Sequence, residues 1–82
     1  MSFERNDTYN NVVDVVAKKL SIDKNGITEN SSFQDLGADS LDMFEIVTRL
    51  EDVFGIEFDD ESTEKLTGMR EVVDYIHERR VK

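Results

Sequence analysis

The 82-residue chain contains no cysteine, no proline and a single histidine, His77. Without cysteine there is no disulfide framework, no thiolate nucleophile and no cysteine-based metal site, and one histidine excludes a histidine-rich site. No apolar run approaches membrane-spanning length, and the N-terminal residues lack the apolar region of a signal peptide. The sequence therefore predicts a soluble, cytoplasmic protein with no metal site and no membrane insertion.

The formal net charge of -9 is concentrated in one part of the chain. Residues 39–61 contain nine acidic side chains and only one basic side chain, Arg49, whereas the flanking segments are close to balance. Such a field repels nucleic acid and anionic membranes, and it attracts basic protein surfaces. A solvated helix face in an acidic protein has the same composition, so charge alone leaves both interpretations open.

Apolar residues recur at helical spacing in several parts of the chain. The pattern predicts helices over residues 9–20, 40–54 and 70–80 and a shorter helix over residues 59–66. Gly55 follows the second of these and is a suitable helix C-cap. The expected fold class is an all-α, antiparallel four-helix bundle with three main helices and one short third helix.

A long loop, residues 21–39, is expected between the first two helices because it is rich in Ser, Asn, Asp, Thr and Gly. Its apolar anchors are Ile27, Phe33 and Leu36. Asp7 or Thr8 is the expected cap of the first helix, and residues 1–8 are then a loose N-terminal extension; the alternative is an earlier helix start that includes Phe3 and Glu4. The whole chain, residues 1–82, is predicted to be one domain.

The predicted helix over residues 40–54 has two distinct faces. At about 100° per residue, one narrow arc is apolar and forms the expected core face. This arc comprises Met43, Ile46, Val47, Leu50 and Phe54. Leu41 and Phe44 fall away from it, among carboxylates, so the outward face has two large apolar side chains. The alternative is that they pack on neighbouring segments, as a small domain allows.

This helix begins at the sequence Gly37-Ala38-Asp39-Ser40-Leu41-Asp42. Asp39 is a good N-cap, and Asp42 stands three residues later, where a capping box normally has Glu or Gln. Ser40 is then the first helical residue. Its hydroxyl is displayed beside backbone N–H groups that favour an attached phosphate.

These segments also suggest two other functions, a serine hydrolase and a calcium-binding loop. A serine hydrolase is disfavoured because the chain has no G-x-S-x-G elbow and only His77 as a base, on the final helix, so no catalytic residue is predicted. Residues 21–26 partly match a calcium loop, but Ser32 stands where a bidentate Glu is needed. The remaining interpretation is that Ser40 is an attachment point that another enzyme modifies.

The segment from Asp35 to Asp42 resembles the phosphopantetheine attachment motif of acyl carrier proteins of type II fatty-acid synthesis. The resemblance extends from Val12 to Ile76. It includes Glu45-Ile46-Val47, Leu50-Glu51-Asp52, Phe54-Gly55-Ile56-Glu57 and Val73-Asp74-Tyr75-Ile76. It implies a non-enzymatic carrier in which Ser40 holds 4′-phosphopantetheine, installed from coenzyme A by a holo-acyl-carrier-protein synthase, and growing acyl chains are held as thioesters.

The resemblance also implies two sets of binding residues and a monomeric protein. Fatty-acid synthesis enzymes would dock their basic patches on a partner face that comprises Asp39, Leu41, Asp42, Phe44, Glu45, Glu51 and Asp52. An acyl cleft would be lined by Ile46, Leu50, Phe58, Leu66 and Tyr75.

The chain departs from the family pattern at several positions. The family usually has a proline before the short third helix, where this chain has Phe58-Asp59-Asp60. Thr48 replaces a larger apolar residue, Arg49 interrupts the acidic run, and Phe44 is bulkier than usual. Alternatives within the class are carriers for polyketides, specialised lipids or D-alanine. Outside the class they are a calcium-binding module and an acidic interaction module.

Overall fold

The computed structural model describes residues 4–80, which form α1 (Arg5–Leu20), a short 3-10 helix η1 (Lys24–Gly26), α2 (Ser40–Phe54), α3 (Asp60–Lys65) and α4 (Met69–Arg80). The predicted all-α fold, with three main helices and a short third one, is confirmed. Helix α2 has the predicted bounds and ends at Gly55, whose φ of 65° is left-handed. No helix among the described residues is long and apolar enough to cross a membrane.

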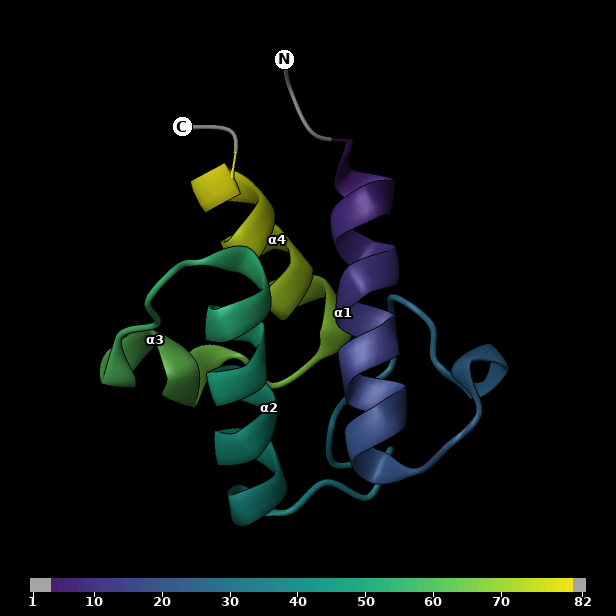
Figure 1. The fold of residues 1–82 in the computed structure, drawn as a ribbon. Coiled ribbons are helices and arrows are strands. Elements are labelled where there is room, and N and C mark those ends of the chain that lie inside the picture. The colour runs from purple at the N-terminus through teal and green to yellow at the C-terminus, as the bar shows by residue number, and fades with distance from the viewer. Residues whose placement is uncertain (1–3, 81–82) are drawn as a thin grey trace.

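Helix α1 packs against both α2 and α4 and runs antiparallel to both, as Figure 1 shows. Helices α2 and α4 therefore point the same way, and the chain returns between them through α3, which lies to one side (Figure 1). The start of α2 lies at the opposite end of the molecule from the start of α1 and the end of α4 (Figure 1). Ser40, at which α2 begins, is therefore far from the contact between the start of α1 and the end of α4.

The core is formed by the apolar stripes of the three main helices, with anchors from the long loop. Its most buried members are aliphatic: Val12, Val16, Ile46, Leu50, Met69, Val72, Val73 and Ile76. Ile27 and Phe33 are also buried, as predicted for the loop anchors, and Leu36 packs against the core while partly exposed. The core face of α2 is confirmed, although Met43 and Phe54 are only half-buried.

The first helix begins earlier than its sequence indicated. Arg5 to Thr8 are helical, so the predicted loose extension over residues 1–8 is wrong for these four residues; residues 1–3 lie outside the described part. Glu4 is the N-cap and makes no side-chain capping bond. The helix start is held instead by α4, because Arg80 Nη1 donates to Thr8 Oγ1 at 3.0 Å and His77 Nδ1 lies 3.1 Å from the same oxygen.

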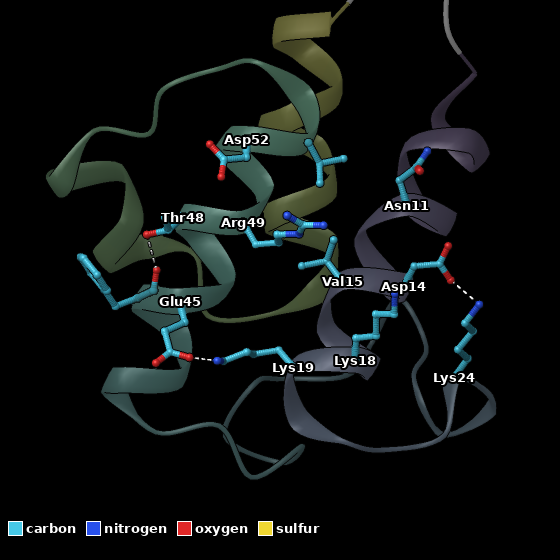
Figure 2. A pocket seen from close by; sticks show the side chains of 12 residues that line it. Asn11, Asp14, Val15, Lys18, Lys19, Lys24, Glu45, Thr48, Arg49 and Asp52 are labelled. Atoms are coloured by element: carbon cyan, nitrogen blue, oxygen red, sulfur yellow. Dashed lines mark hydrogen bonds and ion pairs between the residues drawn. The ribbon is translucent and has the colours of Figure 1, made fainter.

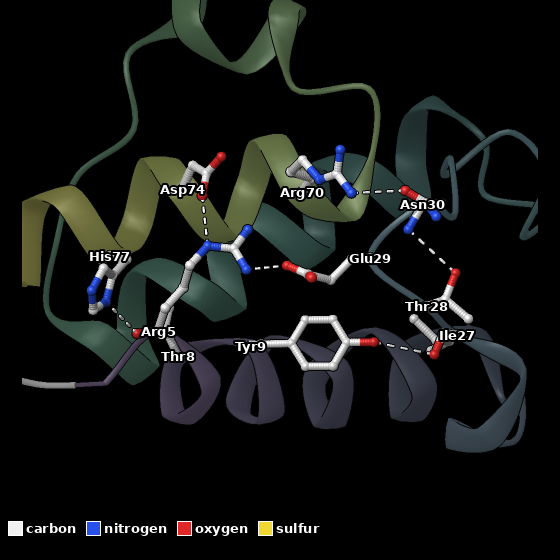
Figure 3. Close-up of polar contacts among 10 residues, drawn as sticks. All are labelled: Arg5, Thr8, Tyr9, Ile27, Thr28, Glu29, Asn30, Arg70, Asp74 and His77. Carbon is white, nitrogen blue, oxygen red and sulfur yellow. Dashed lines mark hydrogen bonds and ion pairs between the residues drawn. The ribbon is translucent and has the colours of Figure 1, made fainter.

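The long loop is fastened to α1 and α4 by polar contacts (Figure 3). Arg5 binds the carboxylates of both Glu29 and Asp74, and these hydrogen bonds raise the pKa of its guanidinium above the usual value. The Tyr9 hydroxyl donates to the Ile27 carbonyl at 3.2 Å, and burial raises its pKa. The loop that precedes α2 is therefore anchored although it has little regular structure of its own.

Candidate functional site

The site is built on the N-terminus of α2. The Asp42 backbone N–H donates to Asp39 Oδ1 at 2.8 Å, and the Asp39 N–H donates to Asp42 Oδ2 at 3.2 Å. This is a reciprocal capping box with an aspartate in place of the usual Glu or Gln. Gly37, with a φ of 85°, makes the turn that leads into it. The predicted cap at Asp39 is confirmed, and it fixes where the helix begins.

Ser40 is the first residue of α2, and its side chain is exposed. Within residues 4–80 its hydroxyl makes no hydrogen bond to another side chain, so it is accessible to an incoming group. The free N–H groups and the dipole of a helix start favour a negatively charged substituent at this point. The geometry therefore suits a covalently attached phosphate.

His77, the single histidine of the chain, lies far from this hydroxyl. His77 was expected at the solvent edge of its helix, but it is half-buried and engaged with Thr8 at the α1–α4 contact (Figure 3). That contact lies at the far end of the molecule from the start of α2 (Figure 1). A serine nucleophile needs its base within hydrogen-bond reach, so the arrangement does not support hydrolysis at Ser40.

The outward face of α2 is partly free and partly committed to internal contacts. Leu41 and Phe44 are 65% and 69% exposed, so they do not pack on neighbouring segments. Asp52 is also exposed. In contrast, Glu45 pairs with Lys19 of α1, and the Glu51 carboxylate accepts a hydrogen bond from the Phe58 N–H at 2.9 Å. Four of the seven predicted partner residues are therefore exposed: Asp39, Leu41, Phe44 and Asp52. The other three, Asp42, Glu45 and Glu51, are half-buried and make internal contacts.

The five residues predicted to line an acyl cleft lie together in or against the core. Ile46, Leu50 and Leu66 are buried, whereas Phe58 and Tyr75 are half-buried with ring centroids 4.7 Å apart. Ile46, Leu50 and Leu66 belong to the core cluster, and Phe58 and Tyr75 pack against that cluster. An acyl chain would therefore have to part side chains that are in contact.

A groove of about 750 Å³ lies elsewhere, between α1 and α2 (Figure 2), and it was not predicted from the residue pattern. Its apolar members are Val15, Phe44 and Val53, and its basic members include Lys18 and Arg49. None of the five predicted cleft residues lines it. The groove follows from the way two helices pack, which no local pattern records.

The partial calcium motif has a structural role. Asp23 Oδ1 accepts a hydrogen bond from the Asn25 N–H at 2.8 Å and caps η1, and Lys24 pairs with Asp14. Among the described residues no group of three or more acidic or histidine side chains is placed to hold a metal ion. The aspartate in this loop thus serves local backbone geometry.

Comparison with known proteins agrees with this site. Residues 10–76 match the family model described as a phosphopantetheine attachment site. An acyl carrier protein of Rubrobacter xylanophilus is 40% identical over 76 residues, which cover 92% of this chain and 94% of that protein. An acyl carrier protein of Lactobacillus johnsonii is 44% identical over 71 residues, which cover 85% of this chain and 89% of that protein.

The fold and the matched family model define the class: a small helical domain that takes a phosphopantetheine group. The chain belongs to the acyl carrier protein family, whose cofactor is 4′-phosphopantetheine. Members of this family are carrier proteins rather than enzymes.

Proposed function

We propose that Ser40 carries the 4′-phosphopantetheine arm, and that the protein transports acyl chains as thioesters between the enzymes of fatty-acid synthesis. The observation that supports this most directly is an exposed serine hydroxyl at the capped start of α2. On attachment from coenzyme A, Ser40 Oγ forms a bond to phosphorus, its proton leaves, and the bond from that phosphorus to the adenosine bisphosphate breaks. The arm supplies the thiol that a cysteine-free chain lacks.

Partner enzymes, the holo-acyl-carrier-protein synthase among them, are proposed to dock beside this serine. The docking surface comprises Asp39, Leu41, Asp42, Phe44, Glu45, Glu51 and Asp52. Its carboxylates would steer basic surfaces of partners quickly, and the two exposed apolar side chains would add a small contact area. A small, partly wet contact also permits fast release, which a carrier that visits several enzymes needs.

The deciding experiment is intact-protein mass spectrometry before and after incubation with coenzyme A and a holo-acyl-carrier-protein synthase. The wild type should gain one phosphopantetheine group, and Ser40→Ala should gain none. Ser62→Ala is the matched control, because Ser62 is a helical serine of α3 away from the motif, and this variant should be modified like the wild type. Modification of Ser40→Ala, or no modification of the wild type, would contradict the proposal.

The chemical group attached to the thiol of the arm distinguishes a fatty-acid carrier from the other kinds of carrier protein. Protein purified from its own host should bear saturated or 3-hydroxy acyl groups on its thiol, identified by mass spectrometry of the released arm. Polyketide intermediates or D-alanine on the arm would instead place the protein in one of the alternative pathways.

A further inference from the structure

The carboxylates of the proposed docking surface differ in their internal partners. Those of Asp39, Asp42 and Glu51 accept hydrogen bonds from backbone N–H groups. These donors are neutral, so each of the three carboxylates keeps its net negative charge. In the described part of the chain, Glu45 is the one docking carboxylate that pairs with a cation, the ammonium group of Lys19. Its charge is therefore compensated before any partner arrives.

The Lys19–Glu45 pair joins the last turn of α1 to the first half of α2, and both residues line the α1–α2 groove (Figure 2). Glu45 follows Leu41 by four residues, so the two side chains lie on the same side of α2. Leu41 is exposed. A basic side chain of a partner that covers Leu41 would therefore meet the carboxylate that Lys19 already holds.

This ion pair is not protected from solvent. The side chains of Lys19 and Glu45 are each 38% exposed. Water and salt weaken the attraction between exposed charges, and such a pair contributes little to stability. A cation from another protein can therefore replace the Lys19 ammonium without disturbing the core.

We infer that Lys19 competes with the basic side chains of partner enzymes for the Glu45 carboxylate, and thereby limits how tightly these enzymes bind. This inference rests on the proposed function of Ser40 and its docking surface. Docking at Glu45 exchanges one ion pair for another, so it yields less binding free energy than docking at an unpaired carboxylate. The displaced ammonium also remains beside the interface, where it repels a basic partner. Both effects favour the fast release that a carrier needs.

The test measures the steady-state kinetics of phosphopantetheine transfer from coenzyme A by a holo-acyl-carrier-protein synthase. Lys19→Gln frees the Glu45 carboxylate and should lower the KM for the carrier about threefold, the size of a surface ion pair, with little change in kcat. Lys19→Arg keeps a cation at this position, so its KM should equal that of the wild type.

Lys18→Gln is the matched control. It removes the same charge from the neighbouring exposed residue, whose side chain forms no ion pair in the described part of the chain. This variant should lower the KM by less than about 1.5-fold, because only screened, long-range attraction changes. In a Glu45→Gln background, Lys19→Gln should lower the KM no more than Lys18→Gln does, because there is no carboxylate left to free.

Urea unfolding establishes that each variant is folded under the assay conditions, and Lys19→Met replaces Lys19→Gln if the latter is not. A wild type that gains no phosphopantetheine group contradicts the proposed function, and the role of Lys19 falls with it. If the wild type is modified, equal KM values for Lys19→Gln and Lys18→Gln overturn the role of Lys19 alone. A threefold effect of Lys19→Gln that persists in the Glu45→Gln background overturns it as well.

Discussion

The α1–α4 contact and the outward face of α2 use polar side chains in opposite ways. Thr8 is fully buried between α1 and α4, and its hydroxyl is engaged by both His77 and Arg80. At the other end of the molecule, Ser40 projects its hydroxyl into solvent beside exposed Leu41. A buried polar group needs internal partners to avoid a desolvation penalty, whereas an exposed one remains available to another molecule. The first region therefore supports the fold and the second is free to react.

The largest difference in the free energy of unfolding is expected between two variants in which a threonine is replaced by valine. Thr8→Val removes the acceptor of Arg80 and the partner of His77 in a buried position, which should lower the free energy of unfolding by about 1–3 kcal/mol. Thr48→Val, on the exposed face of α2, should change it by less than about 0.5 kcal/mol. Urea unfolding of both variants measures the two values. Equal effects would mean that the α1–α4 contact is no more dependent on its polar groups than the surface of α2.

The next comparison lies within the acidic segment. Asp39→Ala removes the capping carboxylate and should lower the free energy of unfolding by about 1 kcal/mol, which corresponds to roughly 4–8 °C in melting temperature for a domain of this size. Asp52→Ala removes an exposed carboxylate and should shift the melting temperature little. A melting temperature of Asp39→Ala equal to that of the wild type would show that α2 does not need its cap.

The smallest expected effect comes from the charge of residues 39–61 as a whole. Repulsion among their carboxylates destabilises the fold at low ionic strength, and added salt screens it. The melting temperature should therefore rise by a few degrees between about 0.01 and 1 M NaCl. Asp52→Lys makes the net charge of residues 39–61 less negative. Its melting temperature should therefore rise less than that of the wild type over the same range of salt. A flat response in the wild type would indicate that these carboxylates are already compensated.

Local signals allowed α2 and its site to be predicted from the sequence. Its cap, its C-terminal Gly55 and the off-stripe positions of Leu41 and Phe44 all depend on residues within a few positions of one another. The start of α1 was missed because Arg5 to Thr8 are polar and lack a capping bond. Their helical structure depends on α4, about 70 residues later in sequence.

Two other contacts were not visible in the pattern of apolar residues. The hydrogen bond from the Phe58 N–H to the Glu51 carboxylate joins the end of α2 to the loop seven residues later. His77 was expected at the solvent edge because Ile76 and Glu78 beside it say nothing of Thr8 on another helix, 69 residues away. Both contacts depend on how the chain folds back on itself, which helical periodicity does not encode.

We propose that the hydroxyl at the start of α2 is a point of attachment. Fragmentation mass spectrometry of protein purified from its own host is the sharpest test, because this locates the modification without an added enzyme. We expect a phosphopantetheine group on Ser40 and on no other residue. An unmodified Ser40, or the group on a different side chain, would contradict it.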